Sequence, residues 1–327
     1  MLSEGSLMKV AITDFTFPSL DTEASLLEPA GVEIVSGQCK TTETLIPLVR
    51  AADAVITQFA PVNRDVIAAM QQARVIVRYG IGVDNVDLAA ARERNIPVCN
   101  VPDYCIDEVA DQTLAFILSI TRQVLPNCLK IRGGGWGLAT PLEEMRALRD
   151  LTVGIVGFGR IGREVSERLA PFKCRRLVFD PAVAADAVKE AAAEPVDLPA
   201  LLAASDIVTL HCPSSPQTRR MIDADAIAKM KAGAILINVG RGDLVDSDAL
   251  IGGLQSGHLS GAGLDVFDPE PLAETSPLRT MPNVVTASHI ASASVRAVKK
   301  LRETAASLAL KAIRGEPLLN VVNGITS

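Results

Sequence analysis

Short apolar runs alternate with amphipathic segments along the first hundred residues. The runs KVAIT, VEIV, AVIT, VIVRYG and PVCNV begin at residues 9, 32, 54, 75 and 97. The segments between them, such as TETLIPLVRA and NRDVIAAMQQ, place apolar residues at helical spacing. Strands that alternate with helices in this way favour a parallel sheet with both faces covered. We therefore predict one α/β unit over residues 1–104.

A second series of apolar runs begins at Leu151 and predicts another parallel sheet. Residues 107–131 precede it and predict a single long helix, followed by the glycine-rich stretch RGGGWG. The last amphipathic segment, SASVRAVKKLRETAASLALKAIRG, predicts a terminal helix whose tail PLLNVVNG returns to the first unit. The runs of the second series are TVGIVGFG, RRLVFD, DIVTLHCP, AILINVGRG, GAGLDVF and NVVTASH. The expected fold class is therefore α/β, with two Rossmann-like or flavodoxin-like domains, parallel sheets and a cleft between them.

Composition narrows the classes of partner. With 327 residues, the chain is long enough for about two hydrophobic cores. Its apolar share of 48% and charged share of 21% are typical of a folded, water-soluble protein. An aromatic content of 3% and a net charge of −6 argue against nucleic acid as a partner, because phosphate binding needs clustered basic residues.

The cysteines, the N-terminal residues and the most apolar helical segment indicate the cellular compartment of the protein. The six cysteines form no CxxC pair and have no neighbouring histidines, so we expect no metal site. Such scattered cysteines are typical of a reducing compartment. The opening MLSEGSLMKV lacks the apolar core of a secretion signal, and EVADQTLAFILSI is too short and polar to cross a membrane. We expect a cytoplasmic protein with no membrane partner, in which residues 1–7 are a loose leader and Met8 is an alternative start.

The stretch VGIVGFGRIGREV carries three glycines in a GxGxxG pattern. An apolar strand precedes them and a helical segment follows. Backbone N–H groups of such a loop, at the positive end of a helix dipole, can bind a pyrophosphate. The next predicted strand ends in Asp180, near the spacing at which a carboxylate binds a ribose diol. Because that acid would repel a 2′-phosphate, we expect NAD(H) to be preferred over NADP(H). A structural turn followed by a chance acid is the alternative.

Only three histidines can serve as acid or base near neutral pH. His289 ends an apolar strand and is the best candidate, whereas His258 lies between glycines and serines and is expected in an exposed turn. His211 also follows a strand and is expected beside a ligand. A histidine acid needs a carboxylate partner, and the residues alone leave Asp265, Asp268 and Glu270 open.

Several motifs together resemble one known family. VGIVGFGRIG, HCPSSPQT, INVGRGDLVD, GAGLDVFDPEP and SHIAS occur in the order found in the D-isomer-specific 2-hydroxyacid dehydrogenases. The stretch RYGIGVDNVDLAAARERNIPVCNVPDYCIDEVADQTLAFIL is similar to the same family, and most similar to the branch that includes the C-terminal-binding proteins. The resemblance runs from about Lys9 to the end. It implies a substrate domain of residues 1–104 plus 297–327 and an NAD-binding Rossmann domain of residues 105–296.

The resemblance also implies roles for individual residues. The family's catalytic residues fall on Arg241, Glu270 and His289. Ile81 and Gly82 match the loop that shares the substrate carboxylate with Arg241. The family usually has proline where this chain has Ser288. The residues expected to bind the cofactor are Gly157, Phe158, Gly159, Arg160, Ile161, Gly162, Asp180, His211, Cys212, Pro213, Thr218, Val239, Gly240, Asp265 and His289.

The activity implied is reversible, NAD-dependent reduction of a small 2-oxo acid to a D-2-hydroxy acid. The hydride comes from the nicotinamide and the proton from the histidine–glutamate pair, with Arg241 holding the carboxylate. A homodimer is also implied, with the segment around Trp136 and Glu143 reaching across. The chain ends before the regulatory domain of many phosphoglycerate dehydrogenases in the family, which makes serine biosynthesis a less favoured role. An alternative function is an NAD(H)-responsive binding protein, similar to the corepressors of this family.

Overall fold

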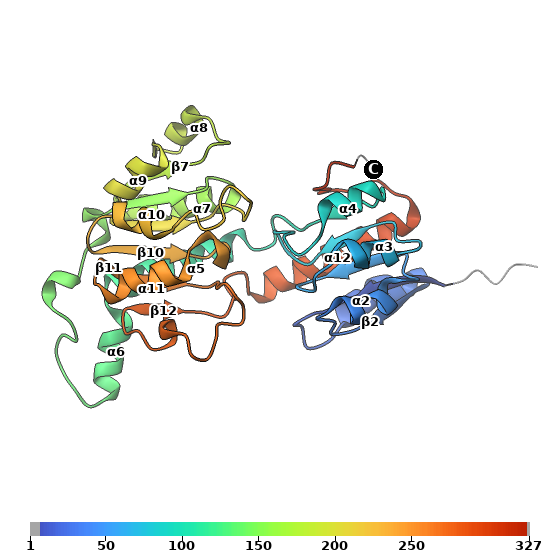
Figure 1. Cartoon of the computed structure of the whole chain (residues 1–327), viewed down its shortest axis with the longest axis horizontal. Coiled ribbons are helices and arrows are strands. Elements are labelled where there is room, and N and C mark those ends of the chain that lie inside the picture. The colour runs from blue at the N-terminus through green and yellow to red at the C-terminus, as the bar shows by residue number, and fades with distance from the viewer. Residues whose placement is uncertain (1–6, 326–327) are drawn as a thin grey trace, which may run out of the picture. The chain divides into compact units, whose positions relative to one another are not determined.

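A computed structural model describes residues 7–325 and divides into two compact units. One unit runs to Tyr104 and resumes at Ser294, and the other is Cys105–Ala293. Each unit is a parallel β-sheet with helices packed on it (Figure 1). Most of the predicted leader, residues 1–6, lies outside the described residues.

The smaller unit is a five-stranded sheet of order β2-β1-β3-β4-β5, parallel throughout. This is the strand order of flavodoxin-like folds. The predicted return of the tail is confirmed, because Val321 pairs with Cys99. Its strands are β1 (Met8–Ile12), β2 (Val32–Ser36), β3 (Ala54–Thr57), β4 (Ile76–Arg78) and β5 (Val98–Cys99). Its helices are α1 (Asp21–Leu27), α2 (Thr42–Val49), α3 (Arg64–Ala69), α4 (Leu88–Glu93) and α12 (Val295–Arg314).

The larger unit is a seven-stranded parallel sheet of order β12-β11-β10-β9-β6-β7-β8. Its strands are β6 (Thr152–Val156), β7 (Arg175–Phe179), β8 (Glu194–Pro195), β9 (Ile207–Leu210), β10 (Ala234–Asn238), β11 (Leu259–Leu264) and β12 (Val284–Thr286). Its helices are α5 (Ile106–Thr121), α6 (Val124–Arg132), α7 (Arg160–Leu169), α8 (Ala185–Glu190), α9 (Leu198–Ala204), α10 (Ala224–Lys229) and α11 (Ser247–Gln255). The apolar pattern missed β8, a two-residue edge strand that contains a proline.

The strand order of the larger sheet indicates at which edge of the sheet a ligand would bind. Counted from β6, the order is that of the Rossmann fold, and it reverses between β6 and β9. In open parallel sheets, ligands bind beyond the carboxyl ends of the strands at such a reversal. The glycine loop follows β6 and His211 follows β9, so both lie at the reversal. The prediction of two parallel-sheet α/β domains is thereby confirmed.

The prediction of a single helix over residues 107–131 is wrong, because the helix is interrupted between α5 and α6. Gln123 adopts the left-handed conformation with φ +52°. The carbonyl of Thr121 accepts the N–H of Arg146 at 3.0 Å instead of continuing the helix. Pro126 was the sequence signal, since proline lacks the N–H for the bond to the residue four positions earlier.

A buried polar cluster lies inside the smaller unit. Glu23 of α1 has no exposed surface, and its carboxylate accepts hydrogen bonds from the Tyr79 hydroxyl at 2.8 Å and from Arg302 Nε at 2.9 Å. Arg302 also donates to the second Glu23 oxygen at 2.5 Å and to the Ser19 carbonyl at 2.7 Å. Its guanidinium lies over the Phe17 ring, 4.8 Å from the centroid. The cluster joins α1, the end of β4 and α12.

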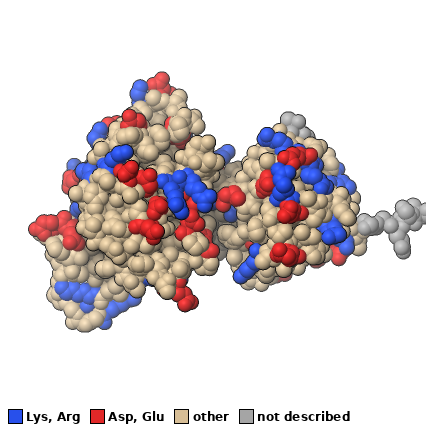
Figure 2. Space-filling model, in the orientation of Figure 1, with Lys and Arg blue, Asp and Glu red and all other residues tan. Residues whose placement is uncertain are grey.

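The surface carries no large region of one charge on the face that Figure 2 draws. Basic and acidic side chains are interspersed there over both units. Within residues 7–325, no helix combines the length and apolarity needed to cross a membrane. Over the same residues, no three side chains of the types that bind metals gather at one place.

Candidate active site

The glycine loop passes directly from β6 into α7. Gly157 has φ +92°, and a Cβ there would lie 2.6 Å from the main-chain nitrogen of Cys212. A Cβ on Gly162 would collide with the Gly157 carbonyl, whereas one on Gly159 would meet open space. The first and third glycines are therefore required by packing within the protein. Gly159, at the N-cap of α7, leaves room for a ligand to approach the backbone.

Asp180 lies behind the glycine loop, at the end of β7. One carboxylate oxygen accepts the N–H of Phe158 at 2.7 Å, and the other accepts the N–H of Ala182 at 2.8 Å. The Asp180 carboxylate is thus hydrogen-bonded to the backbone of the glycine loop. Arg163 reinforces the same corner, with its guanidinium 4.7 Å from the centroid of the Phe158 ring.

The segment after β9 brings four predicted residues together. His211 Nε2 lies 2.9 Å from the Thr209 hydroxyl, and burial lowers the pKa of His211 to about 3. This histidine is therefore neutral at physiological pH and is unsuited to donate a proton. Cys212 follows it, and burial raises the pKa of its thiol to about 11. Thr218 closes the loop by donating to the Pro213 carbonyl at 2.7 Å.

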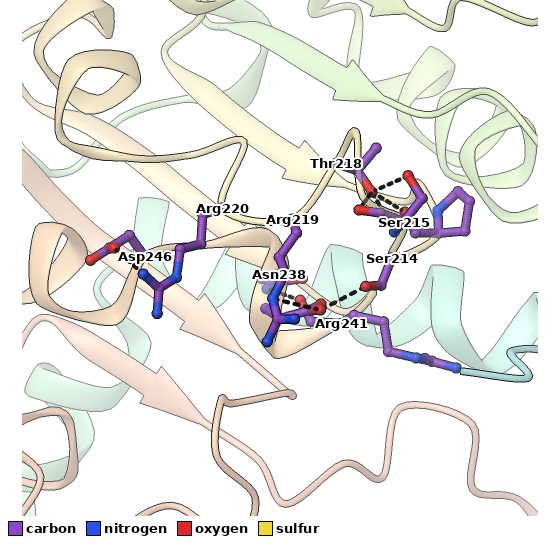
Figure 3. Close-up of polar contacts among 10 residues, drawn as sticks. Ser214, Ser215, Thr218, Arg219, Arg220, Asn238, Arg241 and Asp246 are labelled. Atoms are coloured by element: carbon purple, nitrogen blue, oxygen red, sulfur yellow. Dashed lines mark hydrogen bonds and ion pairs between the residues drawn. The ribbon is translucent and has the colours of Figure 1, made fainter. Parts of the chain in front are cut away.

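Arg241 is presented by a tight turn after β10. The Asn238 side chain accepts the N–H of Gly240 at 3.1 Å and donates to the Arg241 carbonyl at 2.8 Å. Arg241 itself donates from Nη1 to the Gly240 carbonyl at 2.8 Å. Val239 lies in this turn, immediately after the strand. Figure 3 shows Asn238 and Arg241 together at this turn. Asn238 is a positioning residue that the sequence analysis missed, although a polar residue ending the run AILIN was a visible signal.

Asp265 fixes the segment that carries His289. Its carbonyl accepts the His289 N–H at 2.7 Å. Its carboxylate oxygens accept the N–H groups of Ile290 and Ala291, each at 2.9 Å. His289 has φ +57°, a conformation uncommon for any residue but glycine. Three hydrogen bonds to one buried aspartate therefore hold the backbone of the predicted catalytic histidine.

Glu270 is the carboxylate that faces His289. Its Oε2 lies 2.8 Å from His289 Nδ1, and its Oε1 accepts the N–H of Phe267 at 2.8 Å. Of the acids that the residues alone left open, only Glu270 makes this contact in the described part of the chain. Since the carboxylate accepts, Nδ1 carries the proton of this bond. Nε2 is then the ring nitrogen that Glu270 does not contact.

Electrostatics keep Glu270 ionised. Burial alone would raise the pKa of Glu270. The hydrogen bond and the charge of His289, the Phe267 N–H and the charge of Arg241 outweigh this effect and hold that pKa below its ordinary value. The ionised carboxylate can therefore accept the hydrogen bond from His289 Nδ1. The larger unit thus holds a cation, an ionised acid and a histidine within electrostatic range of one another.

Ile81 and Gly82 belong to the smaller unit, in the loop after β4. Asn100 Nδ2 donates to the Ile81 carbonyl at 2.6 Å, and the Val101 N–H donates to the Gly80 carbonyl at 2.9 Å. The N–H groups of Ile81 and Gly82 donate to no acceptor among residues 7–325. Two consecutive N–H groups on a loop held by its carbonyls are suited to an anionic group.

His258 differs from its expectation. It lies at the turn after α11, but it is half-buried, and its Nε2 lies 2.9 Å from the Ile227 carbonyl. This contact gives it a structural partner away from the strand ends that carry Arg241 and His289. It is a packing residue of the turn and not an exposed one.

Comparison with known proteins identifies the motifs as those of one family. Residues 114–291 match the family model of the D-isomer-specific 2-hydroxyacid dehydrogenase NAD-binding domain. A glyoxylate reductase of Korarchaeum cryptofilum is 36% identical over 86% of this chain and 86% of its own length. A D-3-phosphoglycerate dehydrogenase of Methanocaldococcus jannaschii is 34% identical over 97% of this chain. The chain spans 60% of the length of that relative.

A solved structure has the same fold over nearly the whole chain. D-lactate dehydrogenase of Aquifex aeolicus, complexed with NAD and lactic acid, is 26% identical and superposes with a TM-score of 0.85. The match covers 94% of this chain and 96% of that one. These comparisons confirm the family predicted from the sequence motifs. The nearer branch, that of the C-terminal-binding proteins, stays a prediction.

Proposed function

Because this chain belongs to the D-isomer-specific 2-hydroxyacid dehydrogenase family, we propose that it reduces a small 2-oxo acid reversibly to the D-2-hydroxy acid. The observation that carries the proposal is the 2.8 Å contact between His289 and Glu270, with Arg241 close enough to affect the charge of that pair. A charged histidine–carboxylate pair beside a guanidinium is suited to protonating a carbonyl oxygen on an anionic substrate.

NAD(H) is the cofactor that the larger unit fits best. Open space at Gly159 and the N-terminus of α7 suit a pyrophosphate, and the Asp180 carboxylate suits a ribose diol. NADH, when bound, supplies the hydride for reduction of the carbonyl carbon. The relative from Aquifex aeolicus, which is complexed with NAD, supports this choice. We propose that the domain of about residues 105–296 binds the cofactor and that the remainder binds the substrate.

The catalytic roles follow from the groups each residue offers. His289 donates its Nε2 proton to the substrate oxygen, while Glu270 stabilises the imidazolium and fixes its ring orientation. Arg241 offers a guanidinium for two parallel hydrogen bonds to a carboxylate. In the smaller unit, the N–H groups of Ile81 and Gly82 also offer two hydrogen bonds to an anionic group. Asp265 holds the backbone around His289.

The test is NADH oxidation by the purified protein across 2-oxo acids of different size and charge, with NADPH alongside. We expect one or more small acids to drive NADH oxidation. Tight NADH binding without turnover of any acid would contradict the proposal and favour a binding protein that responds to NAD(H).

Asp180→Ala is expected to weaken NADH binding by about tenfold and to reduce the preference for NADH over NADPH. The carboxylate accepts hydrogen bonds from ribose hydroxyls and repels a 2′-phosphate, and alanine does neither. Kd values for both cofactors, measured by fluorescence titration, check this. The control is Asp186→Ala, because Asp186 pairs with Lys189 on α8 at an exposed site. An unchanged cofactor ratio in Asp180→Ala would remove Asp180 from this role.

A homodimer is the assembly we propose, formed through α6 and the segment that follows it. α6 has no buried residue, and its large apolar side chains are exposed. Trp136 is 88% exposed, and Leu142 is 67% exposed. Exposed apolar groups gathered in one segment are typical of a protein interface. In the family, this is the segment expected to reach across to a second copy.

Trp136→Glu is expected to shift the protein from dimer to monomer in analytical ultracentrifugation, because a charge placed in an apolar interface loses hydration. Leu7→Glu is the control, since Leu7 is also exposed but lies in the other unit. A wild-type protein that sediments as a monomer at micromolar concentration would contradict the proposed assembly.

A further inference from the structure

A hydrogen bond between side chains ties the loop after β9 to the turn that carries Arg241. Ser214 Oγ donates to Asp243 Oδ2 at 2.6 Å. The two residues are 29 positions apart in the sequence and belong to different strand–helix connections. Figure 3 shows Ser214 and Arg219 converging on the turn that holds Arg241.

Asp243 belongs to the turn that carries Arg241 and contacts the loop after β9. It stands two residues after Arg241, in the single 3-10 turn Gly242–Leu244. Its carbonyl accepts the N–H of Arg220 at 2.7 Å, and its Oδ2 lies 3.9 Å from Arg219 Nε. The other carboxylate oxygen, Oδ1, is buried and has no hydrogen-bond partner among the described residues. Among the described residues, the Ser214 hydroxyl therefore gives this carboxylate its one hydrogen bond.

The end of this loop beside Pro213 is closed by hydrogen bonds within the loop. Thr218 donates to the Pro213 carbonyl, and its hydroxyl accepts the Ser215 N–H at 2.9 Å. Main-chain bonds join the two segments farther along, where the Ile222 N–H donates to the Leu244 carbonyl at 3.1 Å. Ser214 is thus the loop side chain through which the end beside Pro213 contacts the arginine turn.

We propose that Asp243 is a positioning residue that couples cofactor binding to substrate binding through Ser214. This inference rests on the proposed function, in which Pro213 and Thr218 lie beside the cofactor and Arg241 binds the substrate carboxylate. A cofactor that orders the loop fixes Ser214, and Ser214 fixes Asp243 and the turn of Arg241. The second ligand then binds to a segment already ordered, which gives positive cooperativity.

The experiment measures the Kd of NADH with and without saturating oxamate, an unreactive analogue of a 2-oxo acid. In the wild-type protein, we expect oxamate to tighten NADH binding by about fivefold or more. Ser214→Ala and Asp243→Ala should reduce this ratio to near one while changing the Kd of NADH alone by less than about twofold. The double variant should be no worse than either single variant, because both remove the same bond.

Matched variants separate positioning from general damage. Ser215→Ala removes a hydroxyl of the same loop that contacts Thr218 and not the turn, so its oxamate ratio should equal that of the wild type. Asp243→Asn keeps an acceptor for Ser214 and should retain part of the ratio. Thermal denaturation of each variant shows whether it is folded, and Asp243→Asn carries the test if Asp243→Ala is not.

Failure of the inference is distinct from failure of the function. A wild-type ratio of one, or a full ratio in Ser214→Ala and Asp243→Ala, overturns the coupling while turnover of 2-oxo acids stands. A wild-type protein that binds neither NADH nor oxamate overturns the proposed function, and the coupling with it.

Discussion

His289→Gln is expected to lower kcat for NADH-dependent reduction of the preferred 2-oxo acid by about 10²- to 10⁴-fold. Glutamine has nearly the reach of the imidazole, but its amide cannot donate a proton as an acid. The 2.8 Å contact between His289 and Glu270 would be replaced by a hydrogen bond from an uncharged amide to the carboxylate. Steady-state kinetics with NADH provide the measurement.

NADH binding should survive this change. The glycine loop and Asp180 do not contact the His289 ring, so the Kd of NADH is expected to stay within about threefold of the wild-type value. His258→Gln is the control, because His258 contacts the Ile227 carbonyl and has no place in the proposed chemistry. Turnover that survives in His289→Gln would remove His289 as the acid.

The ionisation of Glu270 adds a pH signature to the same experiment. Its pKa is lowered, so the carboxylate stays charged below its ordinary titration range. A carboxyl group whose pKa is lowered by folding stabilises the folded state at pH values above its unfolded-state pKa of 4.5. That stabilisation is lost as the pH falls through the folded-state pKa. Glu270→Gln should therefore flatten the loss of stability of the larger unit below about pH 4.5. Urea denaturation between pH 3 and pH 7 measures the slope.

Glu23→Gln is expected to destabilise the protein by about 3–5 kcal/mol. The substitution keeps the shape of the side chain but removes the charge opposite Arg302, which is itself 8% exposed. Folding removes the guanidinium from water, and without the opposite charge no ionic interaction offsets that cost. Burial and the neighbouring Glu23 raise the pKa of Tyr79, so its hydroxyl remains a donor at all ordinary pH values. Urea denaturation followed by far-UV circular dichroism measures the loss.

The matched control for this prediction is Glu33→Gln. Glu33 pairs with Lys9 at 3.4 Å, but both side chains are more than a third exposed. Solvent screens such a pair, and its loss should cost under about 1 kcal/mol. Equal effects of Glu23→Gln and Glu33→Gln would show that burial of the cluster does not determine its contribution.

Local sequence patterns were sufficient to predict two parallel sheets and the glycine loop after β6, although they missed the edge strand β8. Apolar runs of four to six residues separated by helical segments leave one economical arrangement, a parallel sheet, because adjacent parallel strands need a crossover. The glycine loop could be recognised because Gly157 directly follows the apolar strand and the helical segment begins three residues later. The break after Thr121 was not predicted, although Pro126 signalled it, because the buried face of α5 continues in sequence as the apolar residues of α6.

Contacts between distant residues were decided only by the tertiary structure. The residues alone left three acids open as partners of His289. In the folded chain, Glu270 contacts the ring of His289, while Asp265 accepts a hydrogen bond from the backbone N–H of the next residue. The bond from Ser214 to Asp243 spans 29 residues, and that from Arg302 to Glu23 spans 279. Hydrophobic periodicity reports which face of an element is buried. Which polar groups meet there depends on where the strand ends come together in space, and local sequence does not encode that.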